Sequence, residues 1–280
     1  MGKLLSELEK QRTDKLFTHS VVVTDNDPAQ SAREFVKSFS SKSDLRVIYT
    51  FEPQPNIALA RNTALKHAEG DFIAFIDDDE YPENDWLLNL YKTCVERKVD
   101  GVLGPVQPYF ENTPPAWVTK GKFFVRPTHE TGYRVKWEEA RTGNVLFKRQ
   151  ILDAGEAPFR SQFDTAGEDV DFFRRMMEKG CTFIWCNEAV AYELVPASRC
   201  NRSYLLRRAL LRGSNFHKHP TDRLKNAAKS LVAVPCYTLA LPVLALFGQH
   251  VFLKYLIKLL DHASRLMAYL GFSTVTRRHT

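Results

Sequence analysis

Short apolar segments alternate with amphipathic segments through the first hundred residues of the chain. The apolar segments are His19–Thr24, Arg46–Phe51 and Phe72–Ile76, and polar turn residues separate them from their neighbours. The amphipathic segments between them, Ala29–Ser40 and Ile57–Ala68, are expected to be helices. Strands and helices that alternate in this way are typical of a parallel α/β sheet. We therefore predict an α/β fold in which helices flank a mostly parallel sheet.

The pattern becomes less regular after residue 100. Five prolines interleaved with aromatic residues lie between Gly101 and Val135, which indicates an excursion loop over a binding cleft and not a second domain. A further strand is predicted at Thr142–Phe147. The sequence Gly167-Glu168-Asp169 then begins a helix that Gly180 ends.

The C-terminal region is apolar in a different way, because Leu231–Phe247 contains no charged residue. Its length is at the short limit of a membrane span, roughly 17–25 residues. Pro235 and Pro242 are expected to kink a helix there. Lysines lie on both sides of the segment, so the charge pattern does not favour translocation of one end over the other. We predict a kinked re-entrant or interfacial hairpin, followed by an amphipathic helix from about His250 to Leu270. A buried helix pair that closes a soluble domain is the alternative.

Composition narrows the class of protein. An apolar content of 44% and a charged content of 26% are those of an ordinary globular protein. The net charge of +6 is modest, and no nucleic-acid-binding module accompanies the basic residues, so we expect no nucleic-acid partner. The five cysteines lack a metal-binding spacing and indicate reduced thiols in a cytoplasmic setting. We divide the chain into a domain at 1–222 and a membrane-associating helical tail at 223–280.

Four acidic residues follow the apolar segment Phe72–Ile76 directly: Asp77, Asp78, Asp79 and Glu80. They fall at the carboxyl end of a predicted central strand, where open α/β sheets bind their ligands. Four adjacent carboxylates repel one another unless a cation is present, and oxygen ligands suit Mg²⁺ or Mn²⁺. The alternative is a solvated acidic turn that caps a helix at Asn84–Val95.

Several short motifs share a fixed order along the chain: Asn56, Ala60-Arg61-Asn62, Gly70-Asp71, Asp77-Asp78-Asp79, Trp86-Leu87, Thr142-Gly143-Asn144, Gly167-Glu168-Asp169 and Gly180. The ordered set resembles the family 2 glycosyltransferases, which have the GT-A fold. The stretch Glu193–Arg199 and the basic, then apolar, tail resemble the succinoglycan-biosynthesis type within that family. The resemblance extends from about Phe17 to about Gly271.

The resemblance implies an inverting enzyme of cell-surface glycan synthesis. Such an enzyme moves a sugar from a nucleotide-diphosphate sugar to a lipid-linked or polysaccharide acceptor. The Asp-X-Asp motif of the family corresponds to Asp77 and Asp79. Asp79 is expected to hold Mn²⁺ or Mg²⁺, which neutralises the charge that develops on the leaving diphosphate. Asp77 is expected to approach the ribose and the metal, and Asp78 either to share this role or to point away.

The resemblance also implies roles for residues of the second half. Asp169 corresponds to the general base that deprotonates the acceptor hydroxyl, a task that requires a tuned pKa. Glu168 is expected to raise that pKa or to bind the acceptor. The alternative is that this pair only begins a helix. Asn144 and Gly143 resemble the element that lines the acceptor or donor sugar, or they form a simple turn into the strand.

The remaining candidate contacts are nucleotide and phosphate ligands. Asp25 corresponds to the acid that recognises uracil or ribose in the family. Arg61 is expected either to contact the nucleotide or to hold its helix to the sheet. Arg199, Arg207 and Arg208 are candidates for binding a diphosphate or a lipid-linked pyrophosphate, since guanidinium groups match phosphate geometry. A solvated basic face is the alternative for these three.

The chain departs from the family pattern at its start. Family members begin with an apolar strand that ends in Pro-Thr-Tyr-Asn-Arg or a similar turn, and no such strand precedes the helix predicted at Lys3–Gln11. We expect either that an amino-terminal segment is missing or that the protein is shortened. A second hypothesis for function follows, a truncated and inert relative that binds membrane or a partner. The enzyme hypothesis places the protein at the cytoplasmic face of the cell membrane, peripheral or re-entrant.

Overall fold

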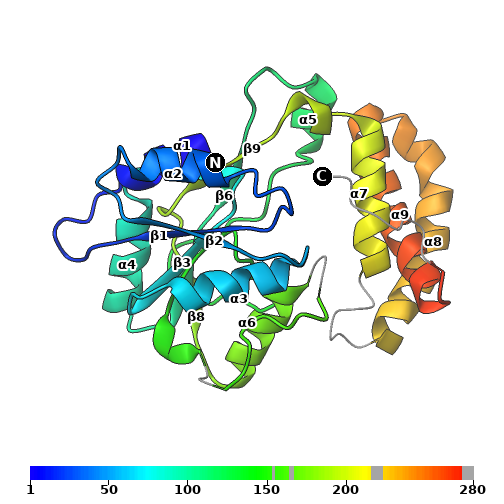
Figure 1. Cartoon of the computed structure of the whole chain (residues 1–280). Coiled ribbons are helices and arrows are strands. Elements are labelled where there is room, and N and C mark those ends of the chain that lie inside the picture. Colours follow the sequence, from blue (N-terminus) through cyan, green and yellow to red (C-terminus); the bar gives the residue numbers. More distant parts are fainter. Residues whose placement is uncertain (153–154, 164–166, 216–222, 273–280) are drawn as a thin grey trace. The chain divides into compact units, whose positions relative to one another are not determined.

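The computed structural model describes residues 1–152, 155–163, 167–215 and 223–272, which form two compact units. Unit 1 comprises Met1–Gln107 and Arg126–Glu193. Unit 2 comprises Pro108–Val125 and the described residues from Leu194 onward. Each unit has its own hydrophobic core, and each is described by itself (Figure 1).

Unit 1 contains most of the strands. They are β1 (Val21–Asp25), β2 (Val47–Phe51), β3 (Phe72–Ile76), β4 (Glu80–Pro82), β5 (Gly101–Leu103), β6 (Val106–Tyr109), β7 (Asn144–Lys148), β8 (Phe183–Trp185) and β9 (Ala191–Leu194), of which β6 and β9 continue into unit 2. Its helices are α1 (Gly2–Glu9), α2 (Arg33–Ser40), α3 (Ile57–His67), α4 (Trp86–Glu96) and α6 (Glu168–Glu178), with a 3₁₀ turn at Arg149–Ile151. The prediction of an α/β fold is confirmed.

Strand directions are mixed. β1 and β2 form a parallel pair, and a second sheet has the order β3-β7-β5-β8. β5 and β8 are parallel, whereas β7 is antiparallel to both of its neighbours. A small third sheet has the order β4-β9-β6. The four-stranded sheet is therefore less parallel than expected, because the segment that leads into β7 is an irregular excursion and not a crossover helix.

Alternating side chains place one helical layer on each face of the central strands (Figure 1). In β5, Val102 packs with α1, α2 and α4, and its neighbour Leu103 packs with α3 and α6. In β7, Leu146 joins the first core and Phe147 the second. This alternation follows from the two-residue period of a strand, and it fixes α3 and α6 on the same face.

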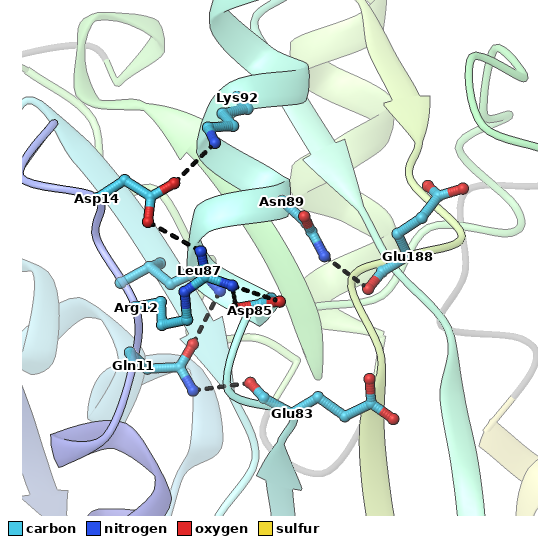
Figure 2. A network of polar contacts seen from close by, with 9 residues as sticks. All are labelled: Gln11, Arg12, Asp14, Glu83, Asp85, Leu87, Asn89, Lys92 and Glu188. Carbon is cyan, nitrogen blue, oxygen red and sulfur yellow. Dashed lines mark hydrogen bonds and ion pairs between the residues drawn. The ribbon is translucent and has the colours of Figure 1, made fainter.

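A polar network holds α4, the helix that follows the acidic motif (Figure 2). The side chain of Gln11 is buried. Its Nε2 donates to the carbonyl of Glu83 at 2.8 Å, and its Oε1 accepts from the backbone N–H of Leu87 at 2.9 Å. Arg12 pairs with Asp85 at 3.0 Å. Gln11 thus caps a helix whose own N-cap residue makes no side-chain cap, and the four acids do not perform this task.

Unit 2 is helical. Its elements are α5 (Ala116–Gly121), a 3₁₀ turn at Ala197–Arg199, α7 (Arg202–Asn215), α8 (Arg223–Ala245) and α9 (Gln249–Tyr269). The middle of the proline-rich excursion, Pro108–Val125, belongs to this unit, and its Val118 and Phe124 pack with Leu205 of α7 and Leu253 of α9. The division therefore differs from the one expected at 222/223.

The tail also differs from the expected kinked hairpin within Leu231–Phe247. A single helix of 23 residues, α8, includes both Pro235 and Pro242. Both prolines are exposed, and each leaves the helix without one backbone N–H donor. The hairpin is instead made by α8 and α9, which turn at Gly248 with a φ of 103°. The amphipathic helix expected at about His250 to Leu270 is confirmed as α9.

Candidate active site

The acidic motif lies at the carboxyl end of β3, as expected. Asp77 follows the strand directly, Asp78 is exposed, and Glu80 begins β4 with its side chain buried. Asp79 is half-buried between them. The burial of Glu80 and the contacts of Asp77 exclude a merely solvated acidic turn.

Arg61 of α3 joins the two acidic motifs, which are separated by about ninety residues in the sequence. Its Nη1 donates to the carboxylate of Glu168, and its Nη2 lies 3.4 Å from Oδ1 of Asp77. The Arg61 side chain is largely buried and lies near the ring of Phe159. Arg61 therefore holds α3 against the sheet and α6, and at the same time its charge faces the place where the two motifs meet.

Glu80 and Glu193 lie directly opposite each other on β4 and β9. Like charges in such a pair repel, and the guanidinium of Arg126 lies between them. It donates to Glu193, and its Nη2 is 3.7 Å from Oε1 of Glu80. Oε1 of Glu80 nevertheless lacks a hydrogen-bond partner, as do two other buried oxygens of this region, Oγ1 of Thr142 and Oε2 of Glu168.

Gly143 lets the acidic side chains approach the backbone before β7. A Cβ at this position would lie 2.9 Å from Oε1 of Glu80 and 3.0 Å from Oδ2 of Asp77. No side chain larger than hydrogen fits without displacing one of these carboxylates. The Thr-Gly-Asn turn thus forms one wall of the site, and glycine is required there by contact distance.

The two acids at the start of α6 have different surroundings. Glu168 is 4% exposed and is paired with Arg61. Asp169 is 16% exposed, and its Oδ2 lies 3.9 Å from Nε of Arg141. Asp169 is therefore the member of the pair that a substrate can reach, and Glu168 holds Arg61 in place.

Burial and like charges raise the pKa values of three acids in the site. Burial, followed by Asp77, raises the pKa of Glu80 to about 9, although Arg126 opposes the rise. Burial also raises the pKa of Glu168, against the opposing charge of Arg61. Burial also raises the pKa of Asp77, and the charge of Arg61 opposes the rise. Because 44% of the Asp77 side chain is accessible, water screens part of this effect.

Two predicted ligands have structural tasks. The amide of Asn144 is buried and satisfied: it accepts from Nε1 of Trp86 at 2.8 Å and donates to the carbonyls of Pro105 and Ala189. These contacts hold the Asn144 side chain in the protein interior, and its role as a sugar contact stays a prediction. Asp25 is also buried and accepts from the N–H groups of Asp27 and Ala32 and from the hydroxyl of Tyr49.

The three candidate phosphate ligands lie in unit 2. Arg199 ends the 3₁₀ turn, and Arg207 and Arg208 are exposed on α7. Asp77 and Glu168 belong to unit 1.

The donor set suits a hard divalent cation that a substrate helps to bind. In the described part of the chain, no three Asp, Glu, His or Cys side chains converge as a complete ligand set. Mg²⁺ often takes only one or two protein carboxylates and completes its shell with water and phosphate. Asp77, Asp79 and the unpartnered oxygen of Glu80 are donors of the required kind. The residues therefore fit a cation shared with a diphosphate.

Sequence reasoning missed Arg126, Arg141 and the buried role of Glu80. Arg126 lies alone between Val125 and Pro127, with no motif around it. Arg141 directly precedes the Thr-Gly-Asn turn, and this neighbouring motif was the only indication in the sequence that Arg141 belongs to the site. Both arginines come near acids through tertiary structure, which short-range spacing does not reveal.

Comparison with known families and proteins agrees with this geometry. The family model described as glycosyl transferase family 2 matches residues 2–155. The succinoglycan biosynthesis protein ExoM of Rhizobium meliloti is 36% identical over 197 residues, which are 69% of this chain and 62% of that protein. The glycosyltransferase GlyA of Streptococcus pneumoniae is 25% identical over 47% of this chain and 18% of its own length. The chain thus spans less than two thirds of these relatives.

Similarity to longer synthases and to solved structures is weaker in sequence. The chondroitin synthase of Pasteurella multocida is 23% identical over 71% of this chain and 24% of its own length. The crystal structure of S. aureus TarS 1–349 in complex with UDP aligns with a TM-score of 0.54 and 18% identity, and the alignment covers 96% of this chain and 86% of TarS 1–349. At that identity the likeness concerns the fold, which is that of GT-A glycosyltransferases.

Proposed function

The chain belongs to glycosyl transferase family 2, and we propose that it transfers a sugar from a nucleoside-diphosphate sugar to an acceptor hydroxyl. The observation that carries the proposal is the double contact of Arg61 with Asp77 and Glu168. It gathers the acids after β3 and the acids at the start of α6 into one charged site. A sugar transfer requires two such groups, one beside the leaving diphosphate and one beside the acceptor.

Asp77 and Asp79 form the donor side in this proposal. They would hold Mn²⁺ or Mg²⁺ together with the two phosphates, and the bound cation would neutralise charge on the departing nucleoside diphosphate. Arg61 orients Asp77, and Arg126 lies between Glu80 and Glu193 beside it. The buried pairs keep this wall of the site rigid while the accessible part of Asp77 faces the ligand.

Asp169 forms the acceptor side. Its carboxylate accepts the proton of the acceptor hydroxyl, which then attacks the anomeric carbon from the side opposite the leaving group and inverts it. Nε of Arg141 lies 3.9 Å from Oδ2 of this base. Glu168 is a positioning residue, because its contact with Arg61 fixes the start of α6.

The finer parts of the proposal concern the substrates and the location. A uridine nucleotide as donor is supported by the fold shared with TarS, which was solved with UDP and with UDP-GlcNAc. A polysaccharide acceptor is supported by the names of the relatives, a succinoglycan biosynthesis protein and a chondroitin synthase. Attachment to the membrane, which we place at its cytoplasmic face, is supported by α8, because its residues Leu224–Ala245 are long and apolar enough to cross a bilayer.

The test is release of nucleoside diphosphate from a panel of nucleotide sugars, with membrane lipid extract or oligosaccharides as acceptors. We expect acceptor-dependent release that requires Mn²⁺ or Mg²⁺ and is lost in Asp79→Ala. The exposed Asp71→Ala, at the opposite end of β3, is the matched control and should stay active. Turnover unaffected by Asp79→Ala would refute the assigned donor side. A folded protein that turns over no donor would favour an inert relative.

A further inference from the structure

Large apolar side chains are exposed along one side of α8. They recur at helical spacing from the first turn of α8 to Leu246, which directly follows the helix, and Leu224, Leu239 and Leu246 are 83%, 80% and 84% exposed. We call this surface the α8 face; it comprises Leu224, Ala228, Leu231, Val232, Pro235, Leu239, Pro242, Val243 and Leu246. A contiguous apolar surface of this length on a folded unit marks an interaction site.

The opposite side of α8 is held by α9. Ser230 is buried and hydrogen-bonds to Nδ1 of His262 at 2.9 Å, and the ring of Tyr237 packs against those of Tyr255 and His262. The hairpin is therefore a packed structure, whereas the side chains of the α8 face are exposed.

Charged residues of α9 oppose insertion of the hairpin across a bilayer. α9 carries Lys254, Lys258, Asp261 and Arg265, and Asp261 pairs with Arg212 of α7 at 3.0 Å. If α8 spanned a membrane, it would either separate from α9 or draw these charges into hydrocarbon, which is strongly unfavourable. A helix that lies flat avoids both penalties, since only its outer face enters the lipid.

The charges of α8 favour an anionic lipid surface. Its only charged side chains with described positions are Lys225 and Lys229, both exposed at the edge of the α8 face near its start. Long lysine side chains at such an edge reach the headgroups while their stems stay in the apolar layer. α8 has no acid to repel an anionic headgroup.

We propose that the α8 face binds the surface of an anionic bilayer, with α8 lying in the plane of the membrane and α9 on its outer side. The proposal rests on the membrane attachment put forward above and specifies its surface, its orientation and its lipid class. Interfacial helices of this kind sit about 5–10 Å into the headgroup and acyl boundary.

A depth profile tests the orientation. In a Cys181→Ser, Cys236→Ser background the other cysteines are buried, so NBD labels can be placed at single sites by Leu224→Cys, Leu231→Cys, Leu239→Cys and Leu246→Cys. On phosphatidylcholine vesicles containing phosphatidylglycerol, we expect all four labels to shift to the blue and to report one shallow depth with lipid-attached quenchers. If the central labels lay deep in the bilayer and the two end labels lay at opposite membrane surfaces, α8 would span the membrane and the proposal would be overturned. A blue shift without vesicles, together with dimers in sedimentation, would assign the face to a second copy of the chain.

Vesicle co-sedimentation tests the surface itself. Leu239→Glu should weaken binding about tenfold or more, whereas Val95→Glu, at an exposed apolar position of α4, should leave it unchanged. Lys225→Gln and Lys229→Gln should each weaken binding to anionic vesicles about fivefold at low salt and leave neutral vesicles unaffected. Equal binding by Leu239→Glu and the unaltered protein would refute the proposal. Asp79→Ala should bind vesicles normally, so failure of the catalytic proposal is distinguishable from failure of this one.

Discussion

Substitution of Gly143 by Ala changes the site by one methyl group at its narrowest contact. The new Cβ would lie 2.9 Å and 3.2 Å from the two carboxylate oxygens of Glu80, and 3.0 Å from Oδ2 of Asp77. Glu80 is buried, whereas Asp77 is partly accessible. Asp77 is therefore the side chain expected to move, away from Arg61.

The expected magnitude follows from overpacking. An extra methyl group in a well-packed region lowers the free energy of unfolding by about 1–3 kcal/mol. For a protein of this size, each kcal/mol lowers Tm by roughly 2–4 °C. Displacement of Asp77 should also weaken binding of the nucleoside diphosphate about tenfold or more, because small misplacements of ligating groups are costly.

Thermal unfolding and calorimetric titration with a nucleoside diphosphate and Mn²⁺ measure both effects. Gly155→Ala is the matched control, since no atom lies within 4 Å of a Cβ at that position. Equal Tm and equal affinity for the two variants would refute the packing of Glu80 and Asp77 against Gly143.

Three further predictions concern the base, the buried acid and the capping network. Asp169→Asn should lower kcat about a hundredfold or more with little change in donor KM, as expected for a general base; a change in KM alone would reassign it to the donor side. In the folded protein Glu80 keeps its proton up to about pH 9, whereas in the unfolded chain it loses the proton near pH 4.5. Its stabilising contribution to the free energy of unfolding is therefore full below pH 4.5 and is lost as the pH rises to 9. In chelator, Glu80→Gln should remove this pH dependence of the unfolding free energy, and parallel pH profiles would contradict the assignment. Gln11→Ala should lower that free energy by about 1–3 kcal/mol, because the N–H of Leu87 and the carbonyl of Glu83 lose their partner; denaturant unfolding with an unchanged midpoint would argue against the cap.

Local patterns predicted the elements of unit 1 well. The segment Phe72–Ile76 is β3 with the expected bounds, and Gly180 follows α6 with a φ of 93°, the left-handed conformation that glycine favours after a helix. Apolar runs and turn residues specify the bounds of these elements within a few residues, so the local sequence was sufficient to predict them. The direction of β7 was not specified in this way, since strand polarity depends on how distant segments connect.

The site was predicted in part, for a related reason. The acids after β3 and at the start of α6 are visible as motifs, and the structure brings both to Arg61. The burial of Asn144 and its hydrogen bonds to three partners are not visible, because those partners are distant in the sequence. The tail illustrates the same limit: prolines predict a break, yet α8 continues through Pro235 and Pro242 where their rings face outward.

Calorimetric titration with nucleoside diphosphates tests the central claim, a diphosphate site built on Asp77 and Asp79, most directly. UDP, GDP and CDP would be titrated with Mn²⁺ and with chelator, into the unaltered protein, Asp79→Ala and the Asp71→Ala control. We predict binding that needs the cation, that Asp79→Ala weakens about tenfold or more, and that Asp71→Ala leaves intact. Binding of equal strength in chelator and in Asp79→Ala, or no binding of any nucleoside diphosphate to the folded protein, would contradict the account.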